Sequence, residues 1–233
     1  MNFSKITVVL ILGFAAIVTG CTNHDKVHKK INYDDLYFDY NVTAEEGDEN
    51  VTCVFQYKNG AEGKAVNIEP AEVELDGQKI ETDSAKLSGF FYEVQKPIDS
   101  FAGKHTIVFT TPDEKHYQNE FTFSPFTLEG ELPEKIDRKP FLIPLKNFPS
   151  GVKSVRLLML DTAFKSEGFN DLVPVINGKI NIDQSVLKTV QNGPINFELY
   201  MEQQLPLKQT TRAGGKISIT YGLKREFELV NRQ

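Results

Sequence analysis

The sequence has no tryptophan and only two cysteines among its 233 residues. Without tryptophan, a carbohydrate-binding surface built on indole stacking is disfavoured. Two cysteines cannot form the several disulfide bonds on which small secreted scaffolds depend. Beyond residue 18, no apolar run approaches the roughly 20 residues that a membrane-spanning helix needs. The fold must therefore rest on an ordinary apolar core.

Positive charge is also in short supply. The chain has 26 Lys and Arg against 32 Asp and Glu, which gives a net charge of −6 at pH 7. Nucleic-acid binding requires clustered cations that displace counterions from phosphates, so we expect no nucleic-acid partner. Apolar residues make up 40% and charged residues 25%, values typical of globular proteins. The length predicts one or two domains.

The N-terminal residues follow the pattern of an export signal. Lys5 is followed by a run without charge at positions 6–18, and the small residues Thr19 and Gly20 precede Cys21. The run is too short to span a bilayer comfortably, and a charged start, apolar middle and small residues are typical of a signal peptide. An ordinary secretory signal with an incidental cysteine and an N-terminal membrane helix are the alternatives.

The stretch Val18-Thr19-Gly20-Cys21 resembles the lipobox of bacterial lipoproteins, although leucine is commoner where Val18 stands. The resemblance implies a diacylglyceryl group on the Cys21 thiol, cleavage before Cys21, and a further acyl chain such as palmitate on the new amino terminus. Each buried methylene contributes about 0.8 kcal/mol, and stable anchoring takes two signals. We therefore expect a signal peptide over residues 1–20 and a polar tether over 21–31. The protein would be anchored to a bacterial membrane, the outer favoured over the inner, facing the periplasm or the exterior.

Residues 32–124 have the period-two alternation of strands. Apolar and polar residues alternate over 36–43 and 51–57, and the acidic turn at 45–49 joins them as a hairpin. Further strands are expected at 66–68 and 73–75, separated by a break at Pro70, and at 91–94, 105–110 and 117–123, with a tight turn at Asp76-Gly77. About seven short strands in this length are typical of a β-sandwich.

Cys53 lies on the more apolar face of the strand at 51–57. Acylation of Cys21 would leave Cys53 without a disulfide partner. Neither a neighbouring histidine nor a helix N-terminus is present to activate the thiol. We expect Cys53 to be buried and to act as a small apolar residue.

Residues 125–233 predict a second sandwich. The hairpin signal Ile176-Asn177-Gly178 separates two strands, and Asp183 is placed to cap a short helix over 183–191. The predicted fold is thus mostly β, with two immunoglobulin-like β-sandwich domains in tandem, 32–124 and 125–233, and one short helix in the second. The other strands are expected at 127–132, 141–145, 152–160, 171–175, 179–182, 195–202 and 215–223.

Several stretches resemble a group of uncharacterised bacterial lipoproteins. In the first half these are "DENVTCVFQYKNG", "AEVELDG", "FFYEVQKPIDSFAGKHTIVF" and "EFTFSPFTL"; in the second they are "NGKINI", "GPINFELYMEQQLPL" and "GGKISITYGLKREFEL". The resemblance covers most of the mature chain. It implies tandem Ig-like domains and no assigned activity.

Signatures of catalysis are weak. The loop at 60–65 looks like a phosphate loop but is two residues short and leads into a strand. No Gly-x-Ser-x-Gly nucleophile turn occurs. His24 and His28 would share one face of a helix, yet a metal site there needs further ligands. His105 and His116 are expected to lie far apart on paired strands. We therefore predict no catalytic residues, no metal and no cofactor.

Three short stretches remain as candidates for a binding or modification site. The carboxylates at 45–49 are candidates for calcium, although a solvated turn is the simpler interpretation. Tyrosines interleaved with aspartates at 33–40 are candidates for sugar or peptide binding. Asp83-Ser84-Ala85 and Asp161-Thr162-Ala163 resemble an O-glycosylation pattern of exported bacterial proteins, which makes Ser84 and Thr162 candidate acceptors.

The sequence predicts a lipid-anchored binding or structural module of the cell envelope without enzymatic activity. Its partners would be the membrane, through the N-terminal lipid, and an unknown protein or glycan. One alternative is an accessory lipoprotein that captures a glycan or peptide with the loops of its sandwich. Another is a hydrolase with two carboxyl groups roughly 5 to 9.5 Å apart in a cleft.

Overall fold

The structure, a computed structural model, describes residues 31–85 and 89–231. Cys21, the predicted signal peptide and most of the predicted tether lie outside the described residues. Residues 32–233 form one compact unit. The predicted fold class is confirmed, because the chain is mostly β and is built from several sheets with one short α-helix.

The largest sheet has nine strands, in the order β13-β12-β15-β16-β1-β2-β6-β5, with β10 also paired to β16. β1 and β16 run parallel, whereas β1 and β2 form the antiparallel hairpin expected around the acidic turn. The members of this sheet are β1 (Leu36–Glu45), β2 (Asn50–Asn59), β5 (Thr82–Ala85), β6 (Gly89–Pro97), β10 (Lys135–Asp137), β12 (Ser154–Asp161), β13 (Phe169–Pro174), β15 (Gly193–Pro206) and β16 (Gly215–Val230).

A four-stranded sheet in the order β4-β3-β7-β8 packs on the large sheet in the first half of the chain. Alternation places aromatic rings between the two layers, where Phe109 packs at 5.1 Å from Phe38 and 4.6 Å from Tyr57, centroid to centroid. The elements here are β3 (Glu72–Leu75), β4 (Gln78–Lys79), β7 (Gly103–Thr110) and β8 (His116–Phe123), with short 3₁₀ helices η1 (Tyr33–Asp35) and η2 (Ile98–Ser100).

A three-stranded sheet in the order β14-β11-β9 belongs to the second half of the chain. It is made of β9 (Thr127–Leu128), β11 (Phe141–Lys146) and β14 (Lys179–Ile182), and we call it the small sheet. The helix α1 (Gln184–Lys188) follows β14. Asp183 caps it as predicted, because its carboxylate accepts the N–H groups of Ser185 and Val186.

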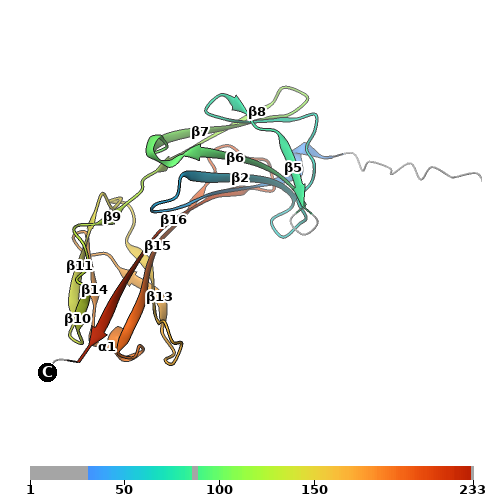
Figure 1. The fold of residues 1–233 in the computed structure, drawn as a ribbon. Coiled ribbons are helices and arrows are strands. Elements are labelled where there is room, and N and C mark those ends of the chain that lie inside the picture. Colours follow the sequence, from blue (N-terminus) through green and yellow to red (C-terminus); the bar gives the residue numbers. More distant parts are fainter. Residues whose placement is uncertain (1–30, 86–88, 232–233) are drawn as a thin grey trace, which may run out of the picture. The chain divides into compact units, whose positions relative to one another are not determined.

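One long hairpin serves both halves of the chain (Figure 1). Near its loop, β16 pairs with β1 from Phe38↔Gly215 to Glu45↔Gly222. Farther from the loop, β15 pairs with β12. The large sheet is therefore continuous across the two predicted domains. The division into domains 32–124 and 125–233 stays a prediction.

Two details of the second half differ from expectation. The strand predicted at 127–132 ends at Leu128, because Gly130 adopts a φ of 93° that carries the chain out of the sheet. The helix predicted at 183–191 ends at Lys188. The predicted Asn177-Gly178 turn is confirmed, since both residues have the positive φ values, 51° and 70°, of a type I′ turn. The hairpin predicted around it is limited to the Ile176↔Lys179 bridge, because β13 pairs with β12 and β14 pairs with β11 in different sheets.

Candidate binding site

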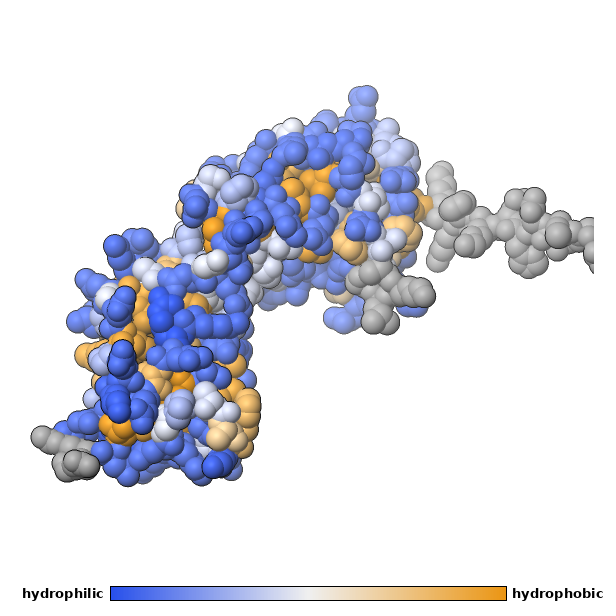
Figure 2. Space-filling view, viewed as in Figure 1, coloured by the Kyte–Doolittle hydropathy of each residue, from blue (hydrophilic) through white to orange (hydrophobic). Residues whose placement is uncertain are grey.

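Two exposed large apolar side chains, Leu142 and Ile176, lie on or beside the small sheet. Among the described residues, the exposed large apolar side chains are Phe90, Leu142, Phe164, Leu172 and Ile176. Leu142 lies on β11, Leu172 on β13, and Ile176 at the turn between β13 and β14. Figure 2 shows apolar surface gathered over the region of β11 and β14. Such a concentration is typical of an interaction surface.

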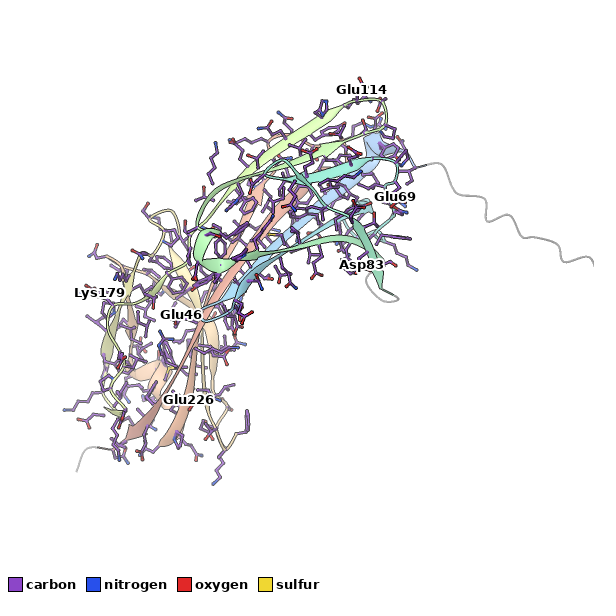
Figure 3. The ribbon with its side chains drawn as sticks, turned by 45° about the horizontal axis from the view of Figure 1, so that its top comes forward. Glu46, Glu69, Asp83, Glu114, Lys179 and Glu226 are labelled. Atoms are coloured by element: carbon purple, nitrogen blue, oxygen red, sulfur yellow. The ribbon has the colours of Figure 1, made fainter. Side chains whose placement is uncertain are left out.

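A cleft of about 760 Å³ lies between β13 and β14, and we call it the β13–β14 cleft. Val173 and Val186 are buried in its wall, whereas Leu142 and Ile176 are 59% and 64% exposed at its edge. Ile176 is held by two backbone hydrogen bonds with Lys179, at 2.9 and 3.0 Å across the type I′ turn. Figure 3 shows Lys179 on β14 at the outer side of the small sheet. The turn thus presents an apolar side chain on a fixed backbone.

The free edge of β13 offers few backbone donors for further strand pairing. Val175 donates its N–H to the Lys153 carbonyl at 2.8 Å, so the alternation turns the backbone groups of Leu172 and Pro174 away from β12. The Leu172 N–H donates instead to the Asp171 carboxylate at 2.7 Å. Pro174 has no N–H to offer. A ligand in the β13–β14 cleft would therefore meet side chains on this wall.

A second cleft, of about 510 Å³, lies between β10 and β11, and we call it the β10–β11 cleft. Its apolar lining includes the buried Leu128 and Ile136 and the half-buried Phe141. Charged side chains stand around it, namely Glu129, Glu131, Lys135 and Asp137, all of them exposed. Leu142 lines both clefts and joins them across the outer face of β11.

The acidic turn after β1 is used in ion pairing. Glu45 pairs with Lys224 at 2.7 Å, and Glu46 pairs with Arg225 at 2.5 Å. Burial raises the pKa of Glu46, but hydrogen bonds from Arg225 and Thr127, with the Arg225 charge, lower it overall. Figure 3 shows Glu46 beside the long hairpin. No three His, Cys, Asp or Glu side chains of residues 31–85 and 89–231 come together as a metal site.

The candidate glycosylation residues are both exposed. Ser84 lies on the edge strand β5, and Thr162 follows β12, where its N–H donates to the Pro194 carbonyl at 3.0 Å. They come from opposite ends of the large sheet and form no common site. Glycosylation stays a prediction. Cys21, His24 and His28 lie outside the described residues.

Cys53 and His105 are buried in the first half of the chain. Cys53 is fully buried, as predicted, and burial together with the Asp76 charge raises the pKa of its thiol to about 12. A thiol held in its protonated form is a poor nucleophile. His105 stacks on Phe101 with ring centroids 3.8 Å apart, and its ring nitrogens lie 2.7 Å from the Asp76 carboxylate and the Phe101 carbonyl. Both residues contribute to the packing of the first half.

The apolar surface of the small sheet was not predicted from sequence. A signal is present in Phe141-Leu142-Ile143, an unbroken apolar run in which the middle residue must face away from its neighbours. Ile176, next to an Asn-Gly turn, is likewise an apolar residue at a position that favours polar ones. Neither pattern reveals that a cleft adjoins it.

Comparisons with known proteins add little. No family model matches the sequence, and no curated protein matches it. The crystal structure of DIP-gamma IG1+IG2 is similar over 84% of this chain and 96% of that chain, with 11% identity and a TM-score of 0.24. The crystal structure of Dpr11 IG1 bound to DIP-gamma IG+IG2 is similar over 81% of this chain and 98% of that chain, with 10% identity and a TM-score of 0.25. The structure of the Yersinia pseudotuberculosis adhesin InvE is similar over 82% of this chain and 59% of that chain, with 9% identity and a TM-score of 0.23. At such TM-scores these similarities carry no argument about function.

Proposed function

We propose that the chain is a non-catalytic binding module of the bacterial cell envelope, anchored through lipid on Cys21, that contacts a protein partner with the outer surface of the small sheet. The observation that carries the binding role is the exposure of Leu142 and Ile176, 59% and 64%, beside two clefts. Exposed apolar groups rimmed by polar residues are typical of protein contacts. The anchor rests on the resemblance of residues 18–21 to a lipobox.

A protein partner is favoured over a glycan. The walls of the β13–β14 cleft include Leu142, Phe169, Val173, Pro174 and Ile176, which offer apolar contact. A sugar needs convergent hydrogen bonds and a flat aromatic face, and the chain has no tryptophan. The described residues that would contact a partner thus suit buried apolar side chains better than hydroxyl groups.

The hydrolase alternative receives no support from the carboxylates around the β10–β11 cleft. Glu129, Glu131 and Asp137 are all exposed. A general acid of the glycosidase type needs an environment that shields it from water, so that it keeps its proton near neutral pH. Solvated rim carboxylates suit the recognition of a cation.

The anchor is tested by Cys21→Ser in the full-length protein. We expect loss of labelling by an alkyne-bearing palmitate analogue, together with release from the membrane fraction or retention of the unprocessed signal. Cys53→Ser is the matched control, because it removes the other thiol and should leave labelling and fractionation unchanged. Unaltered labelling of the Cys21→Ser protein would overturn the anchor.

The binding surface is tested by photo-crosslinking in intact cells. A photoreactive amino acid at Asn181, which lines the β13–β14 cleft, should form a discrete crosslinked protein band. Adding Ile176→Asp should remove that band, because a carboxylate would then stand where an apolar contact is expected. The same amino acid at the exposed Glu62 in the first half is the positional control. Equal crosslinking from both positions, insensitive to Ile176→Asp, would contradict a binding role for this surface.

A further inference from the structure

The strand β11 has an unpaired backbone edge beside the β10–β11 cleft. Leu145 donates its N–H to the Gly178 carbonyl at 2.8 Å, so residues 141, 143 and 145 direct their backbone groups to β14. Leu142 lies in the opposite phase, and its N–H and C=O point away from β14. In the part of the chain that the structure describes, no strand pairs with Leu142 on that side.

β9, the strand that pairs with β11 on this side, ends before it reaches Leu142. β9 pairs with Leu145 and Lys146, and the Glu129 N–H then donates to the Pro144 carbonyl at 2.8 Å. At Gly130, with a φ of 93°, the chain turns away and continues to β10 on the large sheet. The β10–β11 cleft occupies the place where another two or three residues of strand would continue the pairing of β9.

The opposite wall of the cleft is also a strand edge. β10 pairs with β16 through the Glu134 carbonyl, which accepts the Glu228 N–H at 2.7 Å, and through the Arg138 N–H, which donates to the Val230 carbonyl at 2.9 Å. The alternation turns the backbone of Lys135 and Asp137 away from β16, and the Asp137 carbonyl on that side accepts the Lys139 N–H at 2.7 Å. An extended segment in the cleft would thus lie between two backbone edges, over an apolar floor that includes Leu128 and Ile136.

The charged side chains around the β10–β11 cleft indicate which peptide segments it would bind. Three carboxylates, Glu129, Glu131 and Asp137, stand around the cleft against the single Lys135. The Lys135 ammonium is already paired with Glu228 at 3.0 Å. Within residues 31–85 and 89–231, none of the three carboxylates has an ion-pair partner within 4.0 Å. The surroundings are therefore complementary to lysine or arginine side chains.

We propose that a partner's extended peptide segment bearing lysine or arginine binds the β10–β11 cleft as an added strand on β11, hydrogen-bonded to the backbone of Leu142. This inference rests on the proposed binding function and names the chemistry of the partner. Main-chain hydrogen bonds would supply affinity, and the acidic rim would select alternate basic side chains. On this side of β11, Leu142 lies between Pro140 and Pro144, which have no N–H, so the added strand would bond to the N–H and C=O of Leu142.

The test uses fluorescence anisotropy with the protein purified from cells as they process it, in detergent micelles. The probe is a fluorescein-labelled heptapeptide, Lys-Val-Lys-Val-Lys-Val-Lys, acetylated and amidated. We expect saturable binding, weakened at least about tenfold when the lysines become glutamates. A lysine peptide with N-methyl groups on alternate amides should lose binding, because it cannot continue a ladder on that edge.

The matched variants are Leu142→Pro and Leu142→Ala. Leu142→Pro removes the N–H that faces the cleft, and Pro144 occupies the same phase of β11, so the strand tolerates proline there. We expect Leu142→Pro to weaken binding at least about tenfold, and Leu142→Ala, which removes apolar contact but keeps the N–H, to weaken it at least about threefold less than Leu142→Pro does. Circular dichroism melting checks that both variants fold.

Equal binding of the lysine and glutamate peptides, or binding that survives both N-methylation and Leu142→Pro, would overturn the proposal. So would the absence of binding by every peptide. The crosslink at Asn181 and its loss with Ile176→Asp are independent of the Leu142 backbone. A persistent crosslink with no peptide binding would thus refute strand addition while leaving the binding function standing.

Discussion

The Asn119 side chain bonds both backbone groups of Gln209. Asn119 Nδ2 donates to the Gln209 carbonyl at 2.8 Å, and its Oδ1 accepts the Gln209 N–H at 3.0 Å. The same Oδ1 accepts the Lys208 N–H at 2.9 Å, and Asn119 is only 1% exposed. One buried amide on β8 therefore fixes the loop of the long β15–β16 hairpin to the first half of the chain.

Asn119→Ala should lower the free energy of unfolding by about 2–3 kcal/mol, because three backbone groups lose a partner in a buried place. Urea denaturation followed by circular dichroism measures the change. Gln118→Ala is the control on the adjacent, exposed residue, whose own side chain is not needed for the Gln118 N–H bond to Gln209. A loss below about 0.5 kcal/mol for Asn119→Ala would refute this role.

The Glu46–Arg225 pair should make stability fall in acid. The pKa of Glu46 is lowered in the folded state, so its contribution is present above the unfolded value of about 4.3 and is lost as the pH falls below it. Arg225→Gln should cost about 1 kcal/mol at pH 7 and less at pH 3. Lys135→Gln, which breaks the exposed pair with Glu228, should cost little at either pH. Equal losses for Arg225→Gln at both pH values would argue against the pair.

Cys53 should be inert in the folded protein. At pH 8 we expect a thiol reagent to label it only as fast as the protein unfolds, because the thiol is fully buried. Its raised pKa, about 12, means that the contribution to stability is complete below the unfolded value of about 8.5 and declines as the pH rises toward 12. Cys53→Ala should reduce this decline. Labelling of the native protein as rapid as that in denaturant would show that the thiol is accessible.

Gly222 gives the long hairpin room for an aromatic ring. A Cβ atom at Gly222 would lie 2.5 Å from Cε1 of Tyr200 on the paired strand. Gly222→Ala should therefore displace the Tyr200 ring and destabilise the protein by about 1–3 kcal/mol. Gly151→Ala is the control, since a Cβ there meets no atom within 4 Å and its φ is not positive. Comparable melting temperatures for the two variants would mean that the ring adjusts freely.

Local features of the fold could be predicted from sequence because neighbouring residues determine them. The alternation around Cys53, the cap at Asp183 and the turn at Asn177-Gly178 are each fixed by a few adjacent side chains. The parallel pairing of Phe38 with Gly215 could not be predicted, since alternation assigns a face to a strand but no partner. The candidate site depends on such pairings: the Leu142 edge is open only because the chain leaves β11 at Gly130.

The parallel pairing of β1 with β16 also determines when the sheet can close. The Thr211 hydroxyl donates to the Leu36 carbonyl across 175 residues of chain, and β1 gains its parallel neighbour only from residues 215–222. During synthesis, β1 and β2 can form their hairpin early, but the other edge of β1 stays open until those residues have been made. An open edge can pair with another chain. Nascent chains that stop before residue 215 should therefore aggregate, and folding should be completed only late in translation.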